Sequence, residues 1–140
     1  IPGGSSTPML PADKVDTPYD YEAIAAAGSM LGSGALIVMD HTTNIVETTL
    51  RLAHFYMHES CGKCTPCREG TRWIWQMLTD ILRRRANSKT VDVIKDVCDN
   101  MSFKCFCPLG DAAISPVLSS IKLFPDEYAS YFSDATKVFE

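Results

Sequence analysis

Hydrophobic residues recur at three- and four-residue steps through most of the chain after residue 42, which is the pattern of amphipathic helices. Polar residues occupy the positions between them, so each helix would bury one face. Short loops separate these segments, and four helices joined by short loops predict an antiparallel bundle. The predicted helices cover residues 43–59, residues from soon after Cys67 to Arg85, residues 90–101, residues 110–123, and a last turn or two within 125–132.

The first 40 residues follow a different pattern and are rich in Gly, Pro and Ser. Residues 34–40 form a short apolar run bounded by Gly34 and Asp40, which predicts a buried strand. Residues 19–27 predict a short helix that Gly28 ends. The fold class is therefore predicted as α+β, with a small α/β unit over residues 1–41 and a mainly α-helical four-helix bundle over residues 42–140.

Composition limits the classes of function. The 140 residues are 46% hydrophobic, which is enough for one or two small domains. The net charge of −4 argues against nucleic-acid binding, which needs a clustered basic face. No apolar stretch approaches the roughly 20 residues that cross a bilayer, so we expect no direct membrane insertion and any membrane link to run through partners.

The chain carries 6 cysteines, and three of them, Cys61, Cys64 and Cys67, fall within one short segment. Two residues between successive thiols let one loop wrap three corners of a [4Fe–4S] cluster, while a distant thiol supplies the fourth. Cys105 and Cys107 both offer that thiol. A proline follows Cys107, as in ferredoxin-type segments, so the predicted ligands are Cys61, Cys64, Cys67 and Cys107.

Other uses of these cysteines fit the spacing less well. A structural zinc site usually draws two pairs of ligands from separate loops, although zinc stays open as an alternative. Disulfides would need a secreted chain, and nothing here resembles a signal peptide. The third thiol also does not fit a thioredoxin-like motif, which has two cysteines. Cys98 lies in a helical pattern and is predicted to pack in the core.

Two basic residues flank the cysteine loop. The unpaired N–H groups at the start of the helix after Cys67 would stabilise a negative iron–thiolate unit, and Lys63 and Arg68 would add positive charge. Donors and positive charge near the sulfurs make a cluster easier to reduce. The alternative is that both side chains are solvated surface charges.

At residues 59–70, Glu-Ser-Cys-Gly-Lys-Cys-Thr-Pro-Cys-Arg-Glu-Gly resembles the cluster loop of the NADH-binding flavoprotein (51 kDa-type) subunit of NADH:quinone oxidoreductase, respiratory complex I. Residues 107–113 resemble that family's fourth-ligand segment, which also favours Cys107. Residues 1–11 and 32–40 are similar to its ubiquitin-like β-grasp (SLBB) domain. The resemblance implies that residues 1–41 are part of this domain and residues 42–140 are the 4Fe–4S-binding domain, in the C-terminal part of a longer protein.

The resemblance also implies a function. In this family the cluster takes electrons from FMN, which NADH has reduced, and passes them to further clusters, including those of a neighbouring iron–sulfur subunit. The resemblance places this subunit in the peripheral arm of a membrane complex, on the cytoplasmic side of the bacterial inner membrane or the mitochondrial matrix side. The family's FMN and NADH segments lie upstream of its SLBB domain, so these 140 residues are not expected to oxidise NADH alone, although the parent protein is an enzyme.

Two other functions remain open on the sequence. One is a structural or docking module in which the cysteines hold zinc or a redox-silent site. The other is the equivalent subunit of an NAD-linked hydrogenase or formate dehydrogenase. Reversible reduction of the cysteine site would distinguish the electron-relay function from the docking function.

Overall fold

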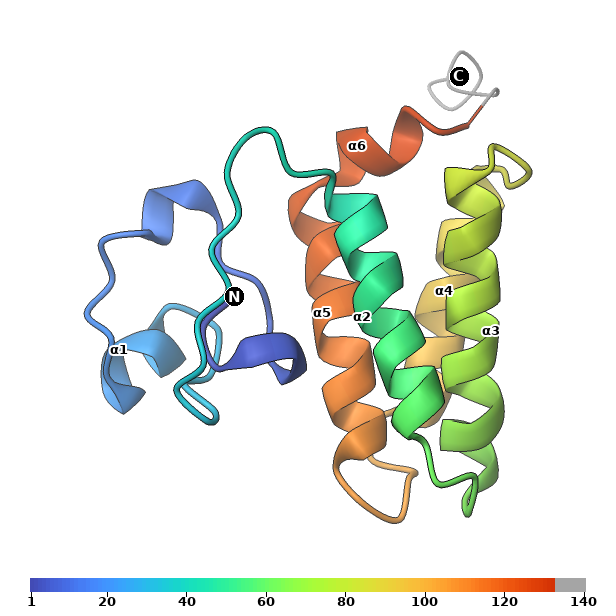
Figure 1. Ribbon diagram of the computed structural model, residues 1–140, viewed down its shortest axis with the longest axis horizontal. Coiled ribbons are helices and arrows are strands. Elements are labelled where there is room, and N and C mark those ends of the chain that lie inside the picture. The colour runs from blue at the N-terminus through green and yellow to red at the C-terminus, as the bar shows by residue number, and fades with distance from the viewer. Residues whose placement is uncertain (133–140) are drawn as a thin grey trace.

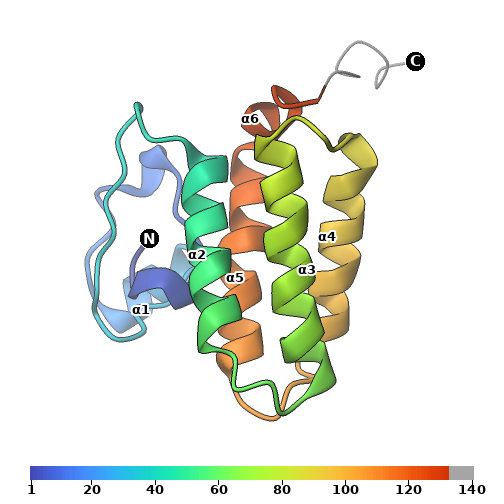
Figure 2. The same cartoon turned by 45° about the vertical axis from the view of Figure 1, so that its right-hand side comes forward.

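Four antiparallel helices form the main body of the computed structural model, which describes residues 1–132 (Figure 1). Each helix packs mainly against two neighbours, in the ring order α2, α3, α4, α5 (Figure 2). The predicted mainly helical bundle is confirmed. The bundle helices are α2 (Ile45–Glu59), α3 (Thr65–Leu82), α4 (Ser88–Met101) and α5 (Leu109–Leu123), and the short α6 (Pro125–Ala129) follows.

Two helices begin earlier than their hydrophobic pattern predicts. Helix α3 begins at Thr65, so Cys67 lies inside its first turn and not before it. Pro66 fits there because the first turn needs no backbone donor. Helix α4 begins at Ser88, since the Asn87 side chain accepts from the backbone of Lys89 and the Thr90 hydroxyl reaches back to the Asn87 backbone. The predicted start at Thr90 was wrong because Thr90 closes a capping box.

The bundle core is continuous between the helices and includes Cys98, which is fully buried as predicted. Helices α3 and α4 approach each other closely at Gly70, where an added Cβ would lie 2.4 Å from the sulfur of Met101. Glycine therefore sets the distance between these helices. The main buried side chains are Val46, Tyr56, Ile74, Leu78, Ile81, Ile94, Val97, Met101, Ile114, Val117, Ile121 and Tyr128.

The N-terminal segment lies beside α2 and α5 (Figure 1). It contains two short 3₁₀ turns, η1 (Gly4–Ser6) and η2 (Ala12–Lys14), and the helix α1 (Tyr21–Ala26). The Met9 backbone N–H donates to the Ser119 hydroxyl at 3.0 Å, and the hydroxyls of Ser5 and Tyr56 lie 3.0 Å apart. A small apolar cluster centred on Ile1, Met9 and Ile45 completes the contact.

The strand predicted over residues 34–40 is wrong for this structure, which has no regular strand within residues 1–132. The segment is extended and makes one antiparallel bridge, between Leu36 and Pro2, while the Ile37 N–H donates to the Ile1 carbonyl at 3.0 Å. Leu36 and Val38 are 58% and 79% exposed, whereas Ile37 lies against the small cluster. The run has the alternation of a strand, but it pairs with only two residues.

Within residues 1–132, no helix combines the length and the apolar character that a membrane crossing requires.

Candidate metal centre

The loop between α2 and α3 and the loop between α4 and α5 meet at one end of the bundle, away from α6 (Figures 1 and 2). They bring the four predicted ligands together. Burial raises the pKa of the Cys67 thiol, and the nearby sulfurs of Cys64, Cys107 and Cys61 raise it further. Thiols 40 positions apart in the sequence therefore lie near one another at this end of the bundle.

The first loop turns tightly after Ser60, the C-terminal cap of α2. Gly62 has φ 73°, a left-handed conformation that glycine adopts without strain. Cys64 is the N-cap of α3 and Cys67 is buried in its first turn. The Ser60 hydroxyl lies 3.2 Å from the Cys67 sulfur and also accepts from the Gly62 N–H at 3.3 Å. The sequence pattern assigned Ser60 no role, although a hydroxyl directly before the first cysteine was a signal.

The basic residues at the first loop behave differently from each other. The Arg68 guanidinium donates to the Gly62 carbonyl at 2.9 Å and to the Glu69 carboxylate at 2.9 Å. Arg68 thus stabilises the loop conformation, and the Glu69 carboxylate neutralises part of the Arg68 charge. Lys63 is exposed at the tip of the loop.

The second loop begins where α4 ends, at Met101. Phe103 has φ 54°, which is unusual for a bulky residue, and its N–H donates to the Asp111 carboxylate at 2.8 Å. The side chains of Phe103 and Phe106 are 91% and 79% exposed. Asp111 belongs to the first turn of α5, so it ties the start of the loop to the helix that follows it. Nothing in the sequence pattern indicated this role.

The two thiols of the second loop have different surroundings. Cys107 is exposed, whereas Cys105 is half-buried and its sulfur donates weakly to the Met101 carbonyl at 3.6 Å. Cys105 also packs on Gly110, where an added Cβ would lie 2.3 Å from the Cys105 sulfur. Burial raises the pKa of Cys105 to about 12. The Cys105 thiol also lies within hydrogen-bonding reach of the Cys64 thiol, so both cysteines of the second loop border the site, and Cys107 is the more exposed of the two.

Hydrogen bonding links the two loops at Cys64. The backbone amide of Phe106 lowers the pKa of the Cys64 thiol below its ordinary value, and the Cys67 amide adds to the effect. Such donors stabilise a thiolate. Within residues 1–132 there is no group of three or more His, Cys, Asp and Glu side chains placed around a single metal ion. The donor set itself, four soft thiolates from two loops, fits an iron–sulfur cluster.

Residues 47–131 match the family model described as the NADH-ubiquinone oxidoreductase-F iron-sulfur binding region. The chain belongs to this family. The NADH-quinone oxidoreductase F subunit of Streptomyces coelicolor is 51% identical over 132 residues, which cover 94% of this chain and 29% of that protein. The corresponding protein of Rickettsia bellii is 45% identical over 131 residues, with 93% of this chain and 31% of that protein covered. The chain thus spans less than a third of these relatives.

A solved structure supports the same fold. The NAD⁺-reducing [NiFe]-hydrogenase in the air-oxidised state superposes with a TM-score of 0.84 and 27% identity, over 95% of this chain and 23% of that chain. The part that matches the iron–sulfur family model contains Cys61, Cys64, Cys67 and Cys107 together with most of the four bundle helices.

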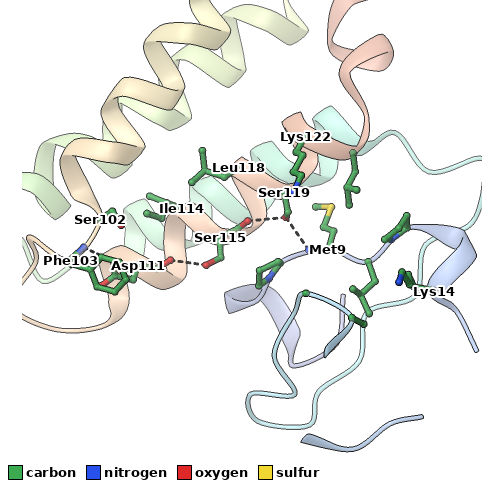
Figure 3. A pocket seen from close by; sticks show the side chains of 16 residues that line it. Met9, Lys14, Ser102, Phe103, Asp111, Ile114, Ser115, Leu118, Ser119 and Lys122 are labelled. Atoms are coloured by element: carbon green, nitrogen blue, oxygen red, sulfur yellow. Dashed lines mark hydrogen bonds between the residues drawn. The ribbon is translucent and has the colours of Figure 1, made fainter. Parts of the chain in front are cut away.

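A separate groove of about 560 Å³ lies between the N-terminal segment and α5 in this member of the iron–sulfur family (Figure 3). Its lining includes Met9, Ile114 and Leu118, with Asp111 at one end and Lys122 near the other. None of the six cysteines lines it. The groove is therefore distinct from the thiol site, although Phe103 of the second loop and Asp111 of α5, which bonds it, both line the groove.

Proposed function

We propose that Cys61, Cys64, Cys67 and Cys107 hold one [4Fe–4S] cluster and that the chain is an electron-transfer module of an NADH:quinone oxidoreductase. The observation that carries this proposal is the convergence of two loops and four thiols in a chain of this iron–sulfur family. When bound, such a cluster accepts and releases one electron at a time.

The surrounding residues suit this role in three ways. The start of α3 directs backbone N–H groups toward the loop, among them the Cys67 amide that bonds the Cys64 thiol, which favours negative charge there. The Ser60 hydroxyl and the Phe106 amide supply hydrogen bonds to the sulfurs of Cys67 and Cys64. Such bonds hold the thiolates in place and raise the reduction potential. Cys67 is buried while Cys61 and Cys107 are exposed, so one side of the site is shielded and the other is open to a redox partner.

We further propose the division into residues 1–41, part of an SLBB β-grasp domain, and residues 42–140, the 4Fe–4S-binding domain. The change from extended segments to long helices at Ile45 supports this boundary. FMN and NADH would bind the remainder of the parent protein, and electrons would leave toward a neighbouring iron–sulfur subunit. The parent complex would then carry this module in a peripheral arm on the cytoplasmic or matrix side of its membrane, and the parent protein, not this chain alone, would be the enzyme.

A second candidate is the equivalent subunit of an NAD-linked hydrogenase or formate dehydrogenase. The superposition on the NAD⁺-reducing hydrogenase favours the hydrogenase form of this alternative. The sequence identities favour the quinone oxidoreductase, since they reach 51% with the Streptomyces protein and 27% with the hydrogenase. Purification of the parent complex and identification of its other subunits decides between the two.

The test of the cluster is iron, zinc and sulfide analysis of anaerobically purified protein, with EPR spectra before and after dithionite. We expect about four irons and four sulfides per chain and a signal that appears on reduction. Zinc without sulfide would refute the proposal and support the docking module.

Cysteine variants test the ligand set. Cys107→Ser should lose most of the bound iron because one corner of the cluster then lacks a thiolate, whereas Cys105→Ser should retain it. The same analysis of iron and sulfide measures both. Loss of iron from Cys105→Ser with retention in Cys107→Ser would reverse the assignment of the fourth ligand.

A further inference from the structure

The second loop holds two thiols, Cys105 and Cys107, only one of which can complete a set of four. Two of the contacts that hold the conformation of this loop come from residues at the start of α5.

The first contact is the hydrogen bond from the Phe103 N–H to the Asp111 carboxylate, 2.8 Å long (Figure 3). It joins the first residues of the loop to the helix after it. Phe103 has φ 54° and its side chain is almost fully exposed, so little packing of that side chain compensates for the unusual backbone. The bond to Asp111 therefore holds this turn together with the bond from the Lys104 N–H to the Met101 carbonyl, 3.1 Å long.

The second contact is the packing of Cys105 on Gly110. The absence of a side chain at Gly110 leaves the space that the Cys105 sulfur occupies, since a Cβ would lie only 2.3 Å away. The same sulfur points toward the Met101 carbonyl at the end of α4. Cys105 is thus half-buried beside the two helices, with its thiol near that of Cys64 on the first loop, whereas Cys107 is exposed.

We propose that Gly110 and Asp111 are positioning residues that keep Cys105 half-buried and leave Cys107 as the more exposed thiol of the loop. The consequence for cluster binding rests on the proposed function. The positions of the two thiols can be measured without a cluster, so a wrong thiol arrangement is distinguishable from a wrong cluster assignment.

The test measures the alkylation rate of each cysteine by iodoacetamide in the full 140-residue chain, after removal of metal and under reducing conditions. Trypsin releases residues 105–122 as one peptide, whose fragment ions separate Cys105 from Cys107. In the unaltered chain we expect Cys107 to react faster than Cys105. Cys98, buried in the core, reports global unfolding in the same sample.

Asp111→Ala should raise the Cys105 rate by about tenfold or more, because a hydrogen bond to a carboxylate is worth at least that factor in an opening equilibrium. Asp111→Asn keeps an acceptor oxygen, so its Cys105 alkylation rate should stay within about twofold of that of the unaltered chain. This rescue is what a hydrogen-bond role requires. Gly110→Ala should raise the Cys105 rate in the same way, through steric displacement.

Asp126→Ala is the matched control, since Asp126 also lies in the first turn of a helix and its carboxylate makes no hydrogen bond to residues 1–132 in this structure. Asp126→Ala should change neither the Cys105 nor the Cys107 alkylation rate. An unchanged Cys105 rate in Asp111→Ala overturns the proposal. An equal rise in Asp111→Asn overturns it in favour of a charge effect, and a parallel rise at Cys98 overturns it in favour of global unfolding.

Discussion

At the scale of single residues, two non-glycine positions within residues 1–132, Phe103 and Arg84, adopt left-handed backbone conformations. Each follows the end of a bundle helix. Their side chains differ: Phe103 is exposed, whereas the Arg84 guanidinium donates to the Ser130 carbonyl at 3.0 Å and lies over the Tyr131 ring. Substitution by glycine should therefore change the free energy of unfolding differently at the two positions.

Phe103→Gly should raise the free energy of unfolding by up to about 1 kcal/mol, since the left-handed penalty of about 1–2 kcal/mol exceeds the added entropy of the unfolded chain. Arg84→Gly should gain less or lose stability, because it also removes two contacts. Urea unfolding followed by circular dichroism measures both. A clear loss of stability in Phe103→Gly would show that its exposed ring contributes to the fold.

Cys98 gives a residue-level prediction for alkaline pH. Burial raises its pKa from 9.0 to about 12 in the folded chain. Above pH 9 the unfolded chain releases this proton while the folded chain keeps it, so the contribution of Cys98 falls as pH rises. The stability difference between the unaltered chain and Cys98→Ala should narrow by about 1.4 kcal/mol per pH unit between about 9 and 12. Urea unfolding at several pH values under reducing conditions measures this difference. A difference independent of pH would contradict the prediction.

At the scale of elements, the close approach of α3 and α4 depends on Gly70. Alanine would gain about 1 kcal/mol in helix propensity, but its Cβ would meet Met101, which is 1% exposed and has no room to move. Overpacking of this kind costs about 1–3 kcal/mol. We therefore expect Gly70→Ala to destabilise the bundle, as measured by thermal or urea unfolding.

A double-mutant cycle provides the control for Gly70. In a Met101→Ala background the obstructing side chain is gone, so Gly70→Ala should cost less than in the unaltered chain. Equal costs in the two backgrounds would mean that the helices are held apart by other contacts.

The sequence predicted the elements with a strong local signal. The 3.6-residue periodicity identified all four bundle helices because each buries one continuous face. It misplaced the starts of α3 and α4, since these depend on Pro66 and on the cap at Asn87 and not on hydrophobic spacing. It predicted a buried strand over residues 34–40 from a short apolar run, but a strand also needs a neighbouring strand, and this run makes a single bridge.

At the site too, residues with a local sequence signal were predicted, whereas contacts between residues distant in sequence were missed. The spacing of Cys61, Cys64 and Cys67 and the proline after Cys107 predicted thiols that the structure brings together. The contacts of Ser60 and Asp111 were missed. Asp111 bonds a residue eight positions earlier, across a loop of irregular conformation, and no periodic pattern indicates such a contact.

At the scale of the whole molecule, the N-terminal segment and the bundle have separate apolar clusters, joined mainly around Ile45. We expect a polypeptide of residues 42–140 to fold, because it retains the whole bundle core, and to bind as much iron as the full chain. Residues 1–41 should be unfolded alone, since a chain of about 40 residues rarely buries enough surface. Circular dichroism and iron analysis measure both. An unfolded 42–140 polypeptide would contradict the proposed domain division.

The arrangement of the thiols on two loops also bears on how the protein is made. Cys107 leaves the ribosome 40 residues after Cys67, which at bacterial or eukaryotic rates of synthesis takes about 2–8 s. During that interval the nascent chain presents three thiols, one of them later buried, without the fourth. Any iron delivered then would meet an incomplete set, so the synthesis of residues 68–107 sets the earliest moment at which the four proposed ligands can act together.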